Sequence, residues 1–259
     1  EGQIITTLAL TEPSARWDAA GIELTATKSG DQYVLNGTKL FVTNANVSDF
    51  MVVAARTGKN EQDISLFIVP SNADGVSLTD LKTIASDKQS EVIFEEVSVA
   101  ENSLLGKENE GWSTIEKVLQ WGAIGKCAEM SGGGQSVLDM TVEYAKQRTQ
   151  FGRPIGSFQA IQHHCANMAT DVEGSKFITY QAAWRLSEGL PAEREVAMAK
   201  AWVSEAYRRV CALGHQSHGA IGFTKEHNMQ LFSRRAKAAE IIFGDSNLHL
   251  EKVAEKIGL

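Results

Sequence analysis

The sequence predicts an α+β protein of more than one domain, in which a small antiparallel β-barrel is followed by an antiparallel four-helix bundle. Short apolar runs separated by Gly, Asn, Asp and Ser fill the first part of the 259-residue chain, as in small all-β domains. After Gly106 the apolar residues recur every three or four positions, which is typical of a helix buried along one face. Strand and helix patterns do not alternate, and this argues against a Rossmann domain.

About six or seven short strands are expected in the first domain, which we place at residues 1–105. Tyr33–Leu35 and Thr38–Val42 flank Asn36-Gly37, a pair that favours a two-residue type I′ hairpin turn. Further apolar runs lie at 50–55, 65–69, 91–94 and 97–99. Short strands at this spacing are typical of a barrel or a sandwich.

The second domain is expected over 106–259, with four long helices and a short final one. Within the first helix, residues 132–134 are all Gly and predict a kink or the close approach of another helix. The final helix follows Gly244-Asp245-Ser246, a break that ends one helix and caps the next. The long helices are expected at 112–147, at 158–187, between Pro191 and Gly214, and from about 224 to 243.

Composition excludes several classes of function. The net charge of −7 argues against a nucleic-acid surface, and no apolar run is long enough for a membrane span. The three cysteines form no CxxC pair, which favours free thiols in a reducing compartment, and no secretory signal opens the chain. We therefore expect a cytoplasmic protein. The start at Glu1-Gly2, without Met, is what a fragment or a processed chain would show.

Four stretches place polar or glycine residues at the ends of predicted elements, where sites are usually built. Two have ordinary structural interpretations beside a functional one. Arg148 and Arg153 are also what the C-terminal end of a helix favours, and Gln216–Phe223 is also a plain glycine-rich turn between helices. The stretches read LALTEP (8–13), FVTNA (41–45), RTQFGRPIGSFQ (148–159) and QSHGAIGF (216–223).

In type, order and spacing these stretches resemble the acyl-CoA dehydrogenase family. The family's TEP, NGxKxxxT, RxQFGxPIxxFQxxQ and QxxGGxGF-like motifs correspond here to TEP (11–13), NGTKLFVT (36–43), RTQFGRPIGSFQAIQ (148–162) and QSHGAIGF (216–223). The third motif is the most specific of the four. The resemblance covers the whole chain but only the family's middle β domain and C-terminal helical domain, and the N-terminal helical domain has no counterpart in these 259 residues.

The resemblance implies FAD as the cofactor. In the β domain, Thr11 and the backbone from Leu8 to Leu10 would bond the pyrimidine edge of the flavin. Phe41 and Thr43 would lie against the isoalloxazine ring, with the Thr hydroxyl near N5.

In the helical domain, the resemblance implies contacts to an FAD bound mainly by a neighbouring subunit. Arg148 and Phe151 would hold its pyrophosphate and adenosine, and Gln216 and Gly219 would take its adenine end. A planar guanidinium suits a diphosphate, and glycine allows close backbone approach. Such sharing implies a homo- or hetero-oligomer, with a tetramer as the expected state.

The resemblance implies α,β-desaturation of an acyl-CoA, as in fatty acid β-oxidation, with electrons leaving through an electron-transfer flavoprotein. A carboxylate of the family removes the α-proton while a β-hydride passes to the flavin. The family usually supplies it from a Tyr-Glu-Gly-Thr break, which here reads Ile242, Phe243, Gly244 and Asp245. Some relatives supply it from the first long helix of this domain, at the position that Gly122 occupies. Both positions lack a carboxylate, so no catalytic base is assigned.

Among the nearby carboxylates, Asp245 is the remaining candidate for a base, although capping the final helix is its expected role. A second departure follows the TEP motif, where relatives have Gly-Ser-Asp and this chain has Arg16-Trp17-Asp18. Trp17 would narrow or fill the acyl pocket. No metal site is expected from His163, His164, His215 and His218, because no carboxylate or thiolate lies at ligand spacing.

Two hypotheses of different class follow. In the first, the chain is part of an FAD-dependent acyl-CoA dehydrogenase that oxidises a CoA thioester. In the second, it is the non-catalytic partner subunit of a heterotetrameric acyl-CoA dehydrogenase and contributes only to the shared FAD site. Other flavin chemistry on a thioester, such as oxygenation, is a third alternative.

Overall fold

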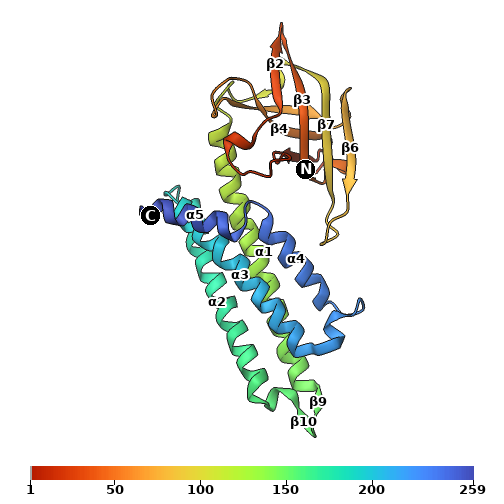
Figure 1. The fold of residues 1–259 in the computed structure, drawn as a ribbon, viewed down its shortest axis with the longest axis vertical. Helices are drawn as coiled ribbons and strands as arrows, with labels where there is room; N and C mark the ends of the chain where they lie inside the picture. The colour runs from red at the N-terminus through yellow and green to blue at the C-terminus, as the bar shows by residue number, and fades with distance from the viewer. Residues whose placement is uncertain (1) are drawn as a thin grey trace. The chain divides into compact units, whose positions relative to one another are not determined.

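The computed structural model describes residues 2–259, and the chain divides into two compact units, Glu1–Val118 and Leu119–Leu259 (Figure 1). The long helix α1 (Trp112–Gln147) begins in the first unit and continues through the second. The division therefore falls inside a helix, and the units are described separately below.

The first unit is built on one eight-stranded sheet whose order is β6-β7-β3-β2-β4-β5-β8, with β1 beside β4. Most neighbours are antiparallel, but β1 and β2 each pair with β4 in parallel. Along β3 and β5 the inward side chains form the core, with Tyr33 packed on Phe67 at a ring distance of 4.9 Å. The strands are β1 (Thr6–Ala9), β2 (Thr25–Ser29), β3 (Gln32–Thr43), β4 (Phe50–Arg56), β5 (Ile64–Pro70), β6 (Val76–Leu81), β7 (Gln89–Ala100) and β8 (Leu104–Leu105).

The α+β class predicted from the sequence is confirmed, but the antiparallel barrel is not. The sheet is mixed, and within residues 2–259 its end strands β6 and β8 pair only with β7 and β5, so it is not closed. The connection between Ala9 and Thr25 lets β1 and β2 run in the same direction. Both strands therefore pair with β4 in parallel.

The prediction of a hairpin turn at Asn36-Gly37 is wrong. These residues lie inside the continuous strand β3, and the turn falls at Gly30-Asp31, between the paired residues Ser29 and Gln32. Asn36 instead accepts a hydrogen bond from the backbone of Glu96 at 2.8 Å, beside an irregularity in the pairing with β7. Gly37 permits close packing, since a Cβ there would lie 2.8 Å from the Leu24 backbone.

The second unit contains most of α1 and four further helices, with a small hairpin between α1 and α2. Buried side chains of α1, α2, α3 and α4 form its core, and α3 packs against α2, α4 and α5. The predicted four-helix bundle is therefore not confirmed as such. The further elements are β9 (Thr149–Gln150), β10 (Arg153–Pro154), α2 (Gln159–Ser187), α3 (Glu193–His218), α4 (Met229–Ile241) and α5 (Ser246–Ile257).

Glycine serves packing rather than termination in two of these helices. α3 continues past Gly214, where a Cβ would meet Val137 of α1 at 2.8 Å. In α1 a Cβ on Gly133 would meet the Tyr207 hydroxyl of α3 at 2.5 Å, so the glycine run serves the close helix approach that the sequence predicts. No helix within residues 2–259 has the length and apolar character that crossing a membrane requires.

Candidate functional site

The TEP segment and β3 are joined by a buried ion pair in the first unit. Lys39 Nζ lies 2.6 Å from Glu12 Oε1, and the two side chains are only 0% and 2% exposed. Glu12 also accepts hydrogen bonds from the backbone of Glu23 and Leu24, and Lys39 donates a second one to the Leu10 carbonyl. Leu40 N donates to the Thr11 carbonyl at 2.8 Å. The ion pair thereby fixes the backbone at Leu10 and Thr11.

The Glu12–Lys39 pair gives both motif residues a structural role that the sequence analysis did not assign. Burial lowers the pKa of Lys39 to about 8, although the Glu12 carboxylate opposes that shift. A Lys at an inward position, in alternation with Tyr33 and Leu35 along the strand, was the available signal, because a buried ammonium requires a partner. Leu8, half-buried, and Leu10, buried, lie on the same segment.

Phe41 and Thr43 end β3 with their side chains exposed. Phe41 has φ +56°, an unusual value for a bulky residue, within the pairing irregularity between Lys39 and Val42. Phe41 is 52% exposed and directly follows Leu40, whose backbone N–H bonds the Thr11 carbonyl of the TEP segment. Strained backbone of this kind is more frequent at binding sites than elsewhere.

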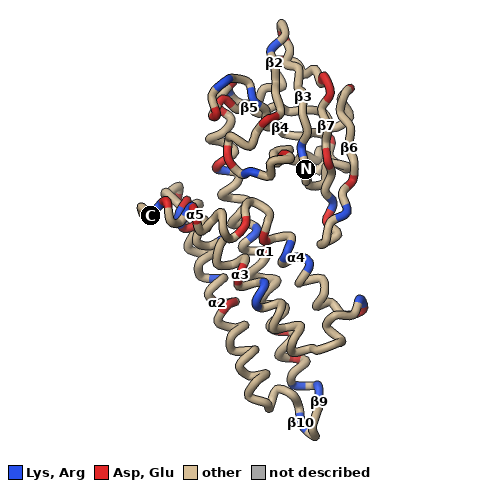
Figure 2. Tube along the Cα trace, in the orientation of Figure 1, with Lys and Arg blue, Asp and Glu red and all other residues tan. Residues whose placement is uncertain are grey.

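Arg148 and Phe151 lie at the end of α1 and in the β9–β10 hairpin, where Lys and Arg gather (Figure 2). Phe151 is 93% exposed, and the Arg148 side chain is also exposed. Within residues 2–259 the structure gives the Arg148 guanidinium neither a hydrogen bond nor an ion pair. By contrast, Arg153 stacks on the Phe158 ring at 4.2 Å. An exposed fork-shaped cation suits a diphosphate, and an exposed ring suits an aromatic base.

Gln216 and Gly219 lie at the end of α3 and are exposed. Gly219 has φ +64° and ψ −145°, a conformation that essentially only glycine adopts, and the space in front of its missing Cβ is open. The neighbouring His218 stacks on Tyr144 of α1 at 4.5 Å and fixes this turn to the end of α1. The ends of α1 and α3 therefore both present open surface. The predicted contacts to a cofactor on another subunit require such surface.

The two histidines of this turn serve packing. His215 Nε2 lies 2.5 Å from Ser233 Oγ, and its ring stacks on Phe223 at 4.4 Å. Burial lowers the pKa of both His215 and His218. Within residues 2–259, no three His, Cys, Asp or Glu side chains come together in an arrangement that would hold a metal ion.

The break between α4 and α5 brings together Phe243 and Gly122, the two positions at which the family resemblance predicts a base. Phe243 has φ +61°, and its ring packs directly over Gly122 of α1. A Cβ placed on Gly122 would lie 2.7 Å from the tip of that ring. Asp245 caps α5, since its carboxylate accepts a hydrogen bond from Leu248 N at 2.9 Å.

Lys200 and His249 hold the backbone of the break. Lys200 is fully buried and donates to the carbonyls of Glu240 and Gly244 at 2.7 and 2.8 Å. His249 Nε2 donates to the Phe243 carbonyl at 2.9 Å. Burial lowers the pKa of Lys200 to about 8 and that of His249 to about 4. A lone Lys within the apolar run 196–203 was the sequence signal for this contact, and it was missed.

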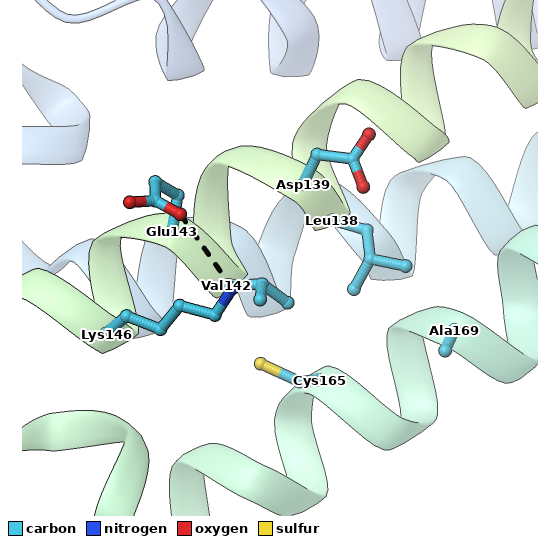
Figure 3. Close-up of a pocket in the computed structure, with 7 residues that line it drawn as sticks. All are labelled: Leu138, Asp139, Val142, Glu143, Lys146, Cys165 and Ala169. Atoms are coloured by element: carbon cyan, nitrogen blue, oxygen red, sulfur yellow. Dashed lines mark ion pairs between the residues drawn. The ribbon is translucent and has the colours of Figure 1, made fainter.

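A groove of about 520 Å³ lies elsewhere, between α1 and α2 (Figure 3). Leu138 and Val142 face Cys165 and Ala169 across it, and Glu143 pairs with Lys146 at its rim. None of the predicted cofactor residues lines this groove. It is therefore not part of the candidate site.

Comparison with protein families gives two matches that together span nearly the whole chain. The acyl-CoA dehydrogenase C-terminal domain matches residues 109–258, and the acyl-CoA dehydrogenase middle domain matches residues 7–97. The chain belongs to the acyl-CoA dehydrogenase family. The family uses FAD as its cofactor. Its members include FAD-dependent dehydrogenases that act on acyl-CoA.

Individual relatives include both reductases and dehydrogenases. The 3-(aryl)acrylate reductase of Clostridium sporogenes is 37% identical over 99% of this chain and 69% of its own length. Subunit CarC of the caffeyl-CoA reductase–Etf complex of Acetobacterium woodii is 38% identical over 93% of this chain and 65% of its own length. The structure of butyryl-CoA dehydrogenase from Megasphaera elsdenii has a TM-score of 0.94 and 32% identity, covering 99% of this chain and 69% of that one. The chain thus spans about two thirds of these relatives.

Proposed function

We propose that this chain is a subunit of an FAD-dependent acyl-CoA oxidoreductase that contributes to a shared FAD site but holds no catalytic base. The observation that carries the proposal is the Phe243 ring packed over Gly122, which leaves an aromatic ring and a hydrogen at the two positions where the family holds its carboxylate. The exposed cofactor residues Arg148, Phe151 and Gly219 support retained FAD binding.

The residues of this chain would bind and orient the cofactor. The Glu12–Lys39 pair would hold the backbone of Leu8, Leu10 and Thr11 against the flavin's pyrimidine edge, and Phe41 and Thr43 would lie along its ring. Arg148 and Gln216 would contact the FAD of a neighbouring subunit. The flavin, when bound, accepts a β-hydride from the thioester or returns one to it.

The missing base affects both directions of the reaction. Oxidation requires a group that takes the α-proton, and reduction requires the same group to return it. Names such as 3-(aryl)acrylate reductase and butyryl-CoA dehydrogenase represent these two directions among the relatives. We therefore propose an acyl- or enoyl-CoA substrate without choosing the direction, and a base supplied by another chain.

The partners follow from this proposal. A hetero-oligomer, with a tetramer as the expected form, would bring in the carboxylate, and an electron-transfer flavoprotein would exchange electrons, as the CarC complex name indicates for that relative. A place in fatty acid β-oxidation and a cytoplasmic location are parts of the same proposal.

A catalytic subunit that uses Asp245 is the second candidate, favoured by the position of Asp245 directly after the break. Its cap on α5 argues against it, because a carboxylate that accepts from Leu248 N is already engaged.

One experiment separates the two candidates. The purified chain, loaded with FAD, is assayed by dye reduction with short, medium and bulky acyl-CoAs, and again as Asp245→Asn. We expect almost no turnover from the lone chain. Robust turnover that Asp245→Asn abolishes would establish Asp245 as the base.

A further inference from the structure

Gly122 and Phe243 are matched to each other across α1 and the α4–α5 break. A Cβ on Gly122 would lie 2.7, 2.8 and 3.0 Å from the Cζ, Cε1 and Cε2 atoms of the Phe243 ring. Non-bonded carbon atoms prefer a separation of about 3.5–4.0 Å, so these approaches are strongly repulsive. No residue larger than glycine therefore fits at position 122 while the ring keeps its place.

The ring is kept in place by the backbone on both sides of it. Phe243 adopts φ +61°, a left-handed conformation that is unfavourable for a bulky residue. Three hydrogen bonds hold it there, two from Lys200 to the Glu240 and Gly244 carbonyls and one from His249 to the Phe243 carbonyl. Strain persists only where the surroundings fix it, so the direction of this ring is determined by the fold.

We propose that Phe243 is a plug that fills the space a catalytic carboxylate would occupy and keeps any side chain at position 122 out of it. The inference rests on the proposed function, in which this chain holds no base. It adds that the space is closed by a matched pair, so that a carboxylate at position 122 functions only if the ring is removed as well.

The chain provides a matched control for the packing part of this proposal. Gly125 lies one helical turn after Gly122 on α1, is exposed, and has no atom within 4 Å of an added Cβ. Replacing Gly by Ala increases the intrinsic helix propensity at either position. Gly125→Ala should therefore raise the unfolding temperature by about 2–4 °C, whereas Gly122→Ala should lower it.

Removing the ring tip should abolish that difference. Phe243→Leu deletes the three ring atoms that approach Gly122 and keeps a branched apolar side chain in the core. In the Phe243→Leu background, Gly122→Ala should raise the unfolding temperature about as much as Gly125→Ala does. If Gly122→Ala and Gly125→Ala have equal effects in the wild-type background, the ring does not exclude a side chain and the plug is wrong.

A second readout tests whether the plugged space is that of the base. The FAD-loaded oligomer of this chain is mixed with butanoyl-CoA without oxygen, and the loss of visible flavin absorbance is followed for Phe243→Leu, Gly122→Glu and the double variant. We expect the double variant to bleach at least 10²-fold faster than Phe243→Leu alone, by the usual contribution of a general base, and Gly122→Glu to stay slow. Equal rates for the double variant and Phe243→Leu would overturn the assignment of this space.

The two outcomes separate this inference from the proposed function. Rapid bleaching by the lone wild-type chain would reject the base-less subunit, yet the comparison of Gly122→Ala with Gly125→Ala would still report on the plug. Conversely, if the wild-type chain is inactive but tolerates Gly122→Ala, the proposed function is supported and the plug is wrong.

Discussion

At the scale of single residues, Arg148 has the most direct expected link to FAD, because its exposed guanidinium is not engaged within the described part of the chain. We predict that Arg148→Ala lowers the FAD content of the assembled protein and that Arg148→Lys restores only part of it, since an ammonium lacks the planar fork. The control is Lys146→Ala, two residues away on the same helix end, whose exposed ion pair with Glu143 is worth little. Unchanged flavin absorbance in Arg148→Ala would remove this residue from the site.

His249 carries a pH prediction at the same scale. Burial lowers its pKa from 6.5 to about 4. Between those values the unfolded chain binds a proton that the folded chain does not, so stability falls as the pH drops from about 6.5 to about 4, by up to about 3 kcal/mol. His249→Gln can still donate to the Phe243 carbonyl and does not titrate. Urea unfolding at about pH 7 and about pH 4.5 should show a smaller acid loss for His249→Gln than for the wild type, and equal losses would contradict the assigned cause.

Among the elements, β3 depends on the Glu12–Lys39 pair. We predict that Lys39→Met destabilises the protein by about 3–5 kcal/mol, because it leaves the Glu12 carboxylate buried without its cation. Lys28→Met is the matched control, since Lys28 pairs with Glu101 at the same 2.6 Å but both side chains are about half exposed. That variant should lose about 0–1 kcal/mol. Chemical unfolding of both variants tests the difference.

The ion pair also predicts a change in cofactor binding. If it holds the backbone of Leu10 and Thr11 for the flavin, Lys39→Met should lose FAD under conditions in which it remains folded by circular dichroism, whereas Lys28→Met should retain it. Retention of FAD by folded Lys39→Met would leave the pair with a purely structural role.

At the scale of the whole molecule, the predicted cofactor residues of the helical unit are exposed, which is the arrangement expected if FAD spans two chains. We therefore predict that FAD retention depends on assembly. On serial dilution, flavin fluorescence should rise, as cofactor is released, over the same concentration range in which light scattering reports dissociation. Release of FAD at concentrations where the oligomer remains intact would show that each chain binds its own cofactor.

The sequence by itself determined the α+β class, the bounds of α1 and α2, and the family. The bounds of the next two helices were less accurate, since α3 continues to His218, past the end predicted before Gly214, and α4 begins at Met229 rather than near 224. Periodicity was sufficient for α1 and α2 because their buried faces repeat regularly over many turns. The motif at 148–162 was sufficient for the family because its residue types are unusual in combination. The lack of a carboxylate at Phe243 and Gly122, where the family resemblance predicts a base, was also readable, because the type of residue at a position is a property of sequence alone.

Only the tertiary structure decided how distant residues combine. Strand pairing is non-local, so the sequence could not show that β1 and β2 join β4 in parallel or that Asn36-Gly37 lies inside a strand. Partner choice for a buried charge is non-local as well, which is why the roles of Lys39 and Lys200 emerged from their contacts. Gly122 and Phe243 lie far apart along the chain, and their fit depends on the approach of two backbones and one ring. Packing of that kind is set by three-dimensional contact rather than by local sequence.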